Sequence, residues 1–142
     1  MDTSEPTHFL DSTTLIHAVD NGAEYHRECL DVISKAAKGQ INTATSLETL
    51  EDTLFILSKL TSPLTALRAT HDYLRMTRIK KYEMKLAIFE HALEIMDITP
   101  LKRPKDAINV ATMLEHSIPR IVSEDKEYDK VDLIQRVHPT DL

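Results

Sequence analysis

The chain alternates short apolar runs with longer segments of helical periodicity, and this alternation limits its fold more than any other feature. Five runs predict strands because they are short, partly β-branched and bounded by polar residues: 8–11, 40–45, 77–82, 120–122 and 133–137. Six segments carry apolar residues at helical spacing: 12–19, 23–37, 46–60, 62–74, 83–96 and 104–117. This order predicts an α/β fold, with a mostly parallel central sheet and helices on both faces.

Length and composition predict an ordinary globular protein. With 142 residues, 42% of them hydrophobic and 28% charged, we expect a single domain over residues 1–142. No apolar run is long enough to span a membrane, and the N-terminal residues lack the basic and apolar regions of a secretory signal. The lone cysteine, Cys29, cannot form an internal disulfide. It favours a reducing compartment, and we expect a cytoplasmic protein.

Several function classes are excluded by what the sequence lacks. The two glycines, Gly22 and Gly39, are too few and too far apart for a P-loop or a dinucleotide-binding turn. Neither CxxC nor HExxH occurs, so the usual zinc sites are absent. The net charge of −6 argues against a protein that coats nucleic acid over its whole surface.

Four acidic residues are candidates for a functional site. Asp11 ends the first predicted strand, Asp125 follows the run at 120–122, and Asp106 lies in the first turn of a helix. Glu51 lies on the helix at 46–60, at the margin of a leucine stripe, and Glu48 points further from that stripe toward solvent. The stripe consists of Leu47, Leu50, Leu54 and Leu57. Ligands of parallel sheets bind beyond the carboxyl ends of the strands, where Asp11 and Asp125 are expected.

Taken singly, each acid is more often a solvated carboxylate or a helix cap than a ligand. Four carboxylates that converge would repel one another, and a divalent cation removes that repulsion. Oxygen ligands favour hard ions, so the expected ion is Mg²⁺ or Mn²⁺. Two such ions would polarise a phosphodiester and generate a hydroxide nucleophile.

Basic residues gather in the second half of the chain and form a candidate RNA-binding strip. The commoner explanation for such residues is a solvated helix face. The functional explanation is that they bring a polyanion to the acidic centre. The predicted contacts are Arg75, Arg78, Lys80, Lys81 and Lys102.

Four stretches of the chain carry a resemblance to the PIN domain family: "FLDSTTLI", "TATSLETLEDTLFIL", "KDAINVATMLEHSIPRIVSEDKEYDKV" and "VHP". Asp11 is similar to the family's strand-ending acid, and Asp106 to the acid of its "Da..aA" helix. Counting from Thr45, as the family motif does, places the helical acid at Glu51. The stretch between residues 60 and 100 matches only in its helical character.

The final acidic turn is the most specific part of the resemblance. The family carries Thr/Ser-x-Asp-x-Asp-aromatic, which Ser123, Asp125 and Tyr128 match, with Glu127 in place of the second aspartate. One departure concerns the first motif, where many members have Asp-Thr-Asn. Here Thr13 replaces the asparagine. Thr13 and Ser123 are the expected supporting residues around the four acids.

The resemblance implies a three-layer PIN-like fold and a Mg²⁺- or Mn²⁺-dependent ribonuclease. It implies the VapC-like toxin group, whose members are homodimers held inactive by a small antitoxin. Two alternatives stay open: a PIN nuclease of RNA processing, and an inactive PIN-fold protein that binds RNA or a partner, which Thr13 favours. A haloacid dehalogenase-type phosphohydrolase is disfavoured because it needs an aspartate where Thr13 stands.

Overall fold

The computed structural model describes residues 5–142, and a five-stranded parallel sheet forms its centre. The strand order across the sheet is β3-β2-β1-β4-β5, and every neighbouring pair is parallel. The strands are β1 (His8–Leu10), β2 (Thr43–Ser46), β3 (Ile79–Tyr82), β4 (Arg120–Val122) and β5 (Gln135–Val137). All five predicted strands are therefore present. The first strand of the chain lies at the middle of the sheet.

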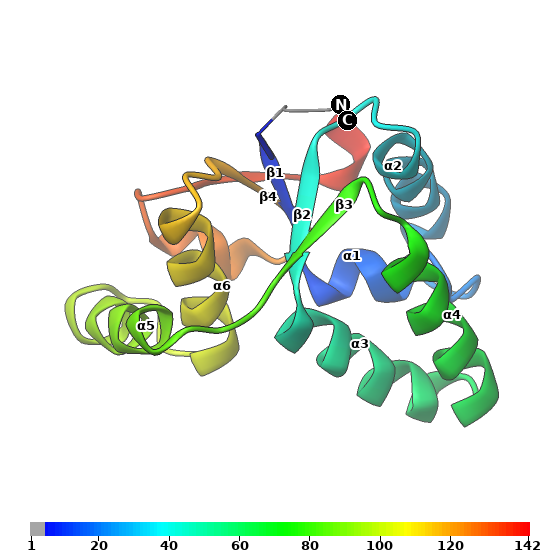
Figure 1. The fold of residues 1–142 in the computed structure, drawn as a ribbon, viewed down its shortest axis with the longest axis horizontal. Helices are drawn as coiled ribbons and strands as arrows, with labels where there is room; N and C mark the ends of the chain where they lie inside the picture. The colour runs from blue at the N-terminus through cyan, green and yellow to red at the C-terminus, as the bar shows by residue number, and fades with distance from the viewer. Residues whose placement is uncertain (1–4) are drawn as a thin grey trace.

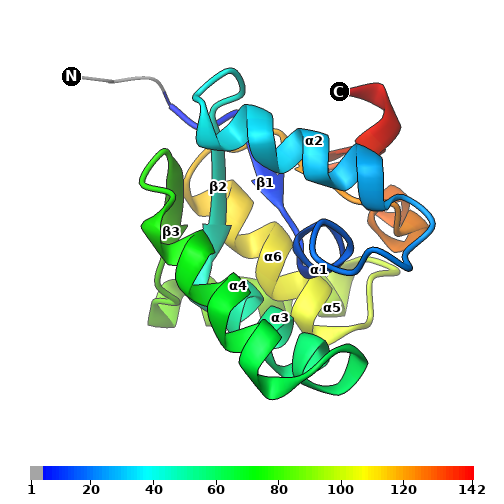
Figure 2. The same cartoon turned by 90° about the vertical axis from the view of Figure 1, so that its right-hand side faces the viewer.

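Helices cover both faces of the sheet, as expected for a parallel arrangement. They are α1 (Ser12–His17), α2 (His26–Ala37), α3 (Leu47–Leu60), α4 (Pro63–Arg75), α5 (Leu86–Ile98) and α6 (Pro104–Glu115), with short 3₁₀ helices η1 (Lys126–Lys130) and η2 (Pro139–Asp141). Figure 1 shows α5 and α6 on one side of the strands and α1 to α4 on the other. In Figure 2 the second group faces the viewer. The predicted α/β fold class is confirmed.

Strand alternation divides the core into two main clusters. Phe9 and Ile121 point toward α5 and α6, whereas their neighbours Leu10 and Val122 pack with α1 and α2. This follows from the two-residue period of side chains along a strand. All four side chains are fully buried, so the two central strands are apolar on both faces. No helix within residues 5–142 has both the length and the apolar character needed to cross a membrane.

Local signals in the sequence set several helix ends. The backbone N–H of Thr14 donates to Asp11 and that of Thr49 donates to Ser46, so these two residues cap α1 and α3. Gly39 follows α2 with φ of 75°, and its N–H donates to the carbonyl of Ala36. A side chain would disfavour that left-handed conformation, which explains why α2 stops at a glycine.

Two helices bury a face that differs, partly or wholly, from the one that the apolar pattern predicts. On α3 Leu50 and Leu57 of the predicted stripe are buried together with Thr49 and Thr53, whereas Leu47 is 40% exposed. On α5 the pattern Leu86, Phe89 and Leu93 is exposed, because that helix packs through a second stripe that consists of Ile88, Ala92 and Ile95. Both helices are apolar on more than one side. Spacing alone therefore predicts the helices but not the faces that they bury.

Candidate metal centre

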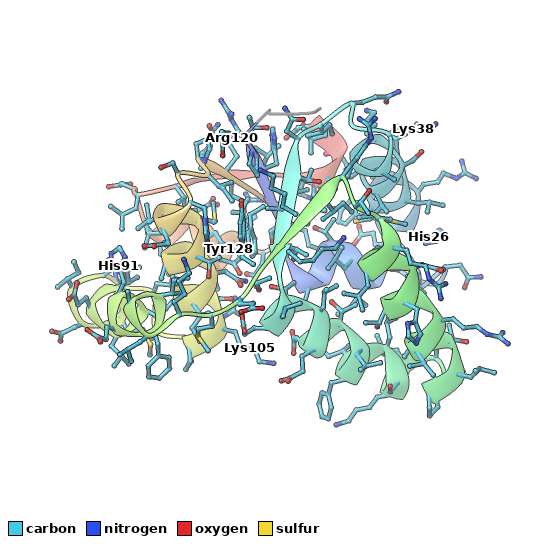
Figure 3. The ribbon with its side chains drawn as sticks, viewed as in Figure 1. His26, Lys38, His91, Lys105, Arg120 and Tyr128 are labelled. Carbon is cyan, nitrogen blue, oxygen red and sulfur yellow. The ribbon has the colours of Figure 1, made fainter. Side chains whose placement is uncertain are left out.

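A cleft of about 870 Å³ opens at the carboxyl ends of the strands, between α3 and α6. All four predicted acids, Asp11, Glu51, Asp106 and Asp125, line it together with Thr13. Four further charged residues also line it: Glu48 and Asp52 on α3, and Arg103 and Lys105 at the start of α6. Figure 3 shows Lys105 between α6 and α3 in this view.

Asp11 is the most buried acid of the cleft. It follows β1 directly, is 3% exposed, and accepts a hydrogen bond of 2.9 Å from the backbone N–H of Thr14. Burial raises its pKa from 3.8 to about 6, and hydrogen bonds from Ser123 and Thr14 oppose this shift. Thr14 and Ser123 therefore hold the Asp11 carboxylate, and the supporting role of Thr13, which lines the cleft, stays a prediction. A cation beside it would stabilise the ionised form.

Asp106 lies in the first turn of α6 and is 8% exposed. Burial raises its pKa, while the Arg103 guanidinium and the Tyr128 hydroxyl oppose that rise by hydrogen bonding to the carboxylate. Asn109 donates to the Tyr128 hydroxyl at 3.0 Å and accepts from Thr49 at 3.3 Å. This chain of hydrogen bonds joins α3, α6 and η1 behind the carboxylate and fixes its orientation.

Asp125 caps η1, where its side chain accepts from the backbone N–H of Glu127. Its own N–H donates to the Ser123 hydroxyl at 3.0 Å, and the expected supporting role of Ser123 in the site stays a prediction. Burial acts to raise the pKa of Asp125. The Glu127 N–H and the Arg103 guanidinium outweigh burial, and the pKa lies below its ordinary value. Asp125 is therefore ionised throughout the neutral range.

The acids of α3 differ in burial from the expectation. Glu51 is exposed, whereas Glu48 is half-buried, so the predicted order of the two glutamates is wrong. The reason is that the buried face of α3 is shifted from the predicted one: it includes Thr49 and Thr53 beside Leu50 and Leu57 of the stripe, and Leu47 is exposed. That face carries Asp52 toward the cleft, where its side chain is 11% exposed and ion-paired with Lys105.

The sequence reasoning missed Asp52. A signal that points to it is its position three residues after Thr49, a spacing that places both on one face of a helix. The helix cap at Ser46 and the buried Thr53 mark the same face. The assignment of Glu51 as a ligand stays a prediction, and Asp52 is a second candidate for the same role.

The predicted RNA-binding residues lie away from the cleft lining. Arg75 ends α4 and Arg78 precedes β3, so both lie toward the amino end of that strand, opposite the cleft. Lys81 donates to the Met76 carbonyl and Lys102 to the Met96 carbonyl. Their contact with RNA stays a prediction. The basic residues nearest the acids are instead Arg103 and Lys105.

The donor set fits a hard divalent cation. It consists of carboxylate oxygens, the ligands that Mg²⁺ and Mn²⁺ prefer. The Glu48 carboxylate adds a buried oxygen, Oε1, that has no hydrogen-bond partner among residues 5–142. Within the same residues, however, no three His, Cys, Asp or Glu side chains are arranged to hold one metal ion together. Arg103, at the N-cap of α6, and Lys105, in its first turn, form ion pairs with the acids instead.

The parallel sheet and the acids at its carboxyl edge make this an α/β protein with an acidic cleft. Comparison with known proteins identifies its family. The PIN domain model matches residues 8–134, and this chain belongs to the PIN domain family. The predicted family is thereby confirmed. A search of curated protein sequences gives no match.

Solved structures of VapC proteins share the fold. VapC20 of Mycobacterium tuberculosis, described as a sarcin–ricin loop cleaving toxin, matches with a TM-score of 0.74 at 17% identity, over 86% of this chain and 92% of that one. DNA-bound VapBC from Salmonella typhimurium matches with a TM-score of 0.70 at 16% identity, over 94% and 98%. A toxin–antitoxin complex from Klebsiella pneumoniae matches with a TM-score of 0.66 at 15% identity, over 95% and 99%.

Proposed function

We propose that this chain is a divalent-metal-dependent ribonuclease that cleaves RNA phosphodiester bonds and serves as the toxin of a toxin–antitoxin pair. The observation that carries the proposal is the position of Asp11, Asp106 and Asp125 around one cleft of a PIN fold. Asp11 and Asp125 also cap helices, but carboxylates that gather in one cleft repel one another. A bound Mg²⁺ or Mn²⁺ would offset that repulsion, as the Arg103 guanidinium does for Asp106 and Asp125 in this structure.

Each acid has a distinct role in this proposal. Asp106 and Asp125 present oxygens that neighbouring hydrogen bonds orient, and Asp11 contributes a third from the end of β1. An acid of α3, Asp52 or the predicted Glu51, completes the set from the opposite wall. These acids would hold a divalent ion, which when bound would polarise the phosphodiester and lower the pKa of the attacking water. Tyr128 and Ser123 hold the carboxylates in place.

The partners follow from the surface and from the neighbouring folds. The hairpin of α3 and α4 exposes the large apolar side chains of Phe55, Leu60, Leu64, Leu67 and Leu74. Exposed apolar residues in such number mark a surface that another chain covers. A small antitoxin and a second copy of the chain are the proposed partners, since the Salmonella and Klebsiella structures are toxin–antitoxin complexes. We place the pair in the cytoplasm.

The test is cleavage of a single-stranded RNA with and without Mn²⁺, by the parent and by two matched variants. Asp106→Asn removes a cleft carboxylate, and Asp129→Asn removes an exposed one that pairs with Arg136. We expect Asp106→Asn to lower the rate by about 100-fold or more, since metal-assisted catalysis supplies several kcal/mol. Asp129→Asn should retain the parent rate. RNA that binds to the parent but stays intact with Mn²⁺ would identify an inactive binding module and contradict the proposal.

A further inference from the structure

Two cations from one turn of the chain neutralise the acids of the cleft. Arg103 donates through Nε to Asp106 and through Nη2 to Asp125. Lys105 donates to Asp52 on the opposite wall. The first turn of α6 therefore supplies counter-charges to acids from three separate elements.

The Arg103 contact is specific in geometry. One guanidinium binds two carboxylates that lie far apart in the sequence, and its planar fork fits this bridging role better than an ammonium would. The two bonded carboxylates increase the proton affinity of the guanidinium, with Asp125 the largest contribution, so the pKa of Arg103 is raised. Arg103 itself is 52% exposed and the Asp106 side chain is 11% exposed. The charged end of Arg103 thus contacts both carboxylates, while the side chain as a whole stays half exposed.

This bridge occupies oxygens that a metal ion would need. Both contacts use the Oδ2 atoms of Asp106 and Asp125. A cation that bound the same oxygens would meet the guanidinium at close range, and the two positive charges repel. The absence of a ready three-acid site among residues 5–142 agrees with a guanidinium between the carboxylates.

We propose that Arg103 is a built-in competitor of the divalent ion, so that metal binding proceeds as an exchange in which the guanidinium leaves Asp106 and Asp125. This inference rests on the proposed function, from which it takes the divalent ion as the ligand. The bridge holds the acids together in the metal-free protein and weakens the affinity for the metal by the free energy needed to break it. Arg103 thereby sets the metal concentration at which the cleft is loaded.

The experiment is isothermal titration of the whole chain with Mn²⁺ alone, without RNA. Arg103→Gln removes the bridge. Lys102→Gln is the matched control, because it removes the same charge at the neighbouring residue, whose side chain donates to the Met96 carbonyl and not to the acids. We expect Arg103→Gln to bind Mn²⁺ about tenfold more tightly than Lys102→Gln does, the effect of removing charge-assisted bonds from a partly exposed site. Arg103→Lys, which keeps the charge and loses the fork, should fall between the parent and Arg103→Gln.

A second measurement follows the guanidinium in the parent itself, so that the result does not depend on how a variant folds. Phenylglyoxal modifies free arginine side chains, and peptide mass spectrometry reports its reaction at Arg103. We expect Mn²⁺ to accelerate modification of Arg103 and to leave that of exposed Arg75 unchanged.

The outcomes separate this inference from the proposed function. Equal Mn²⁺ affinities of Arg103→Gln and Lys102→Gln, with Mn²⁺ binding intact in the parent, would overturn the exchange and leave the metal site standing. In that case, weaker RNA binding by Arg103→Gln would identify Arg103 as a phosphate contact instead. A parent that binds no Mn²⁺ at millimolar concentrations would overturn both the exchange and the metal-dependent function.

Discussion

The two ends of the parallel sheet differ in how deeply the polar side chains next to the strands are buried. At the carboxyl end, Asp11, Ser46 and Ser123 follow or finish strands and are nearly or fully buried. At the amino end, Thr7 and Asn42 precede strands and are half-buried, and Arg78 is exposed. Neighbouring strands are all parallel, so each end of the sheet gathers the same kind of junction from several strands.

The difference teaches where this fold can bury charge. At the carboxyl end a strand leads into a helix, and the first N–H groups of that helix need acceptors. Asp11 accepts from the first turn of α1, and Ser46 accepts from the first turn of α3. At the amino end, β2, β3 and β4 each follow the carboxyl end of a helix, whose last carbonyls lack partners within the helix and favour nearby cations. Lys81, which donates to the Met76 carbonyl after α4, is an example.

The largest expected effect tests which acid of α3 belongs to the carboxyl end. Asp52→Asn should lower Mn²⁺-dependent RNA cleavage by about 100-fold, because a neutral amide is a poorer ligand for a hard cation. Glu51→Gln, on the exposed side of the same turn, should stay within about threefold of the parent, as surface substitutions usually do. The rates are measured side by side, and circular dichroism verifies that both variants keep their helices. A loss confined to Glu51→Gln would restore the original assignment and remove Asp52 from the site.

The next effect concerns the buried charge of Asp11 in the metal-free protein. Its folded pKa of about 6 exceeds the value of 3.8 expected when unfolded, so the folded state binds the proton more tightly. The stability that Asp11 contributes is therefore present below about pH 4 and is lost as pH rises to about 6, by ~3 kcal/mol. Asp11→Asn keeps an acceptor for α1 and has no charge to bury, so it should lack this loss.

Urea unfolding in the presence of EDTA, at about pH 4 and about pH 7, measures the contrast. As the pH rises from about 4 to about 7, the free energy of unfolding of Asp11→Asn should increase relative to that of the parent. A constant difference between the two proteins would mean that Asp11 is not desolvated, which would break the contrast between the two ends of the sheet.

A smaller effect is expected for the path of the RNA. Lys105→Glu, at the cleft, should weaken binding of a single-stranded RNA by about tenfold and flatten its salt dependence. Arg78→Glu makes the same charge change at the amino end of β3 and should alter the affinity by about twofold or less. Fluorescence anisotropy at two salt concentrations measures both. Equal losses would show that RNA also follows the basic residues of the amino end, as the sequence predicts.

The smallest effect is expected behind Asp106. Tyr128→Phe keeps the buried ring and removes the hydroxyl that donates to Asp106 at 3.1 Å. The loss should be about 1 kcal/mol in the free energy of unfolding, the usual contribution of one hydrogen bond. Tyr82→Phe, whose ring stacks on His116, is the control and should change stability less. Equal stabilities of Tyr128→Phe and the parent would show that Asp106 needs no such support.

The sequence predicts the layers of this fold better than it predicts the faces of individual helices. The strands at 8–10 and 120–122 are short, and each ends in two consecutive apolar residues, one for either face of the sheet. A sheet covered on both sides accommodates that pattern, so the architecture follows from them. On α5 both Ile88 and Leu93 suit a core, and only the position of α6 decides that Ile88 is buried and Leu93 is exposed. Tertiary packing, which no local pattern contains, makes that choice.

The candidate site shows the same limit. Asp11 and Asp106 are found from their places at a strand end and a helix start, which are local features. Asp52 is not found, because a stripe of leucines outweighs two threonines on any hydrophobicity scale, although Thr49 and Thr53 are buried as fully as Leu50 and Leu57. Arg103 is missed for a different reason. Its two partners lie on η1 and α6, and a bridge between them exists only once the chain has folded.

The central place of β1 has a consequence for how the protein folds. His8–Leu10 pairs with β2 on one side and with β4, at residues 120–122, on the other. Contacts between segments so distant along the chain form slowly, because closing the long loop between them costs conformational entropy before the contacts can stabilise the structure. Asp11 and Asp125 follow these two strands, so the cleft is assembled only at a late step of folding. A growing polypeptide would therefore stay without an assembled centre until nearly all of these residues had been synthesised.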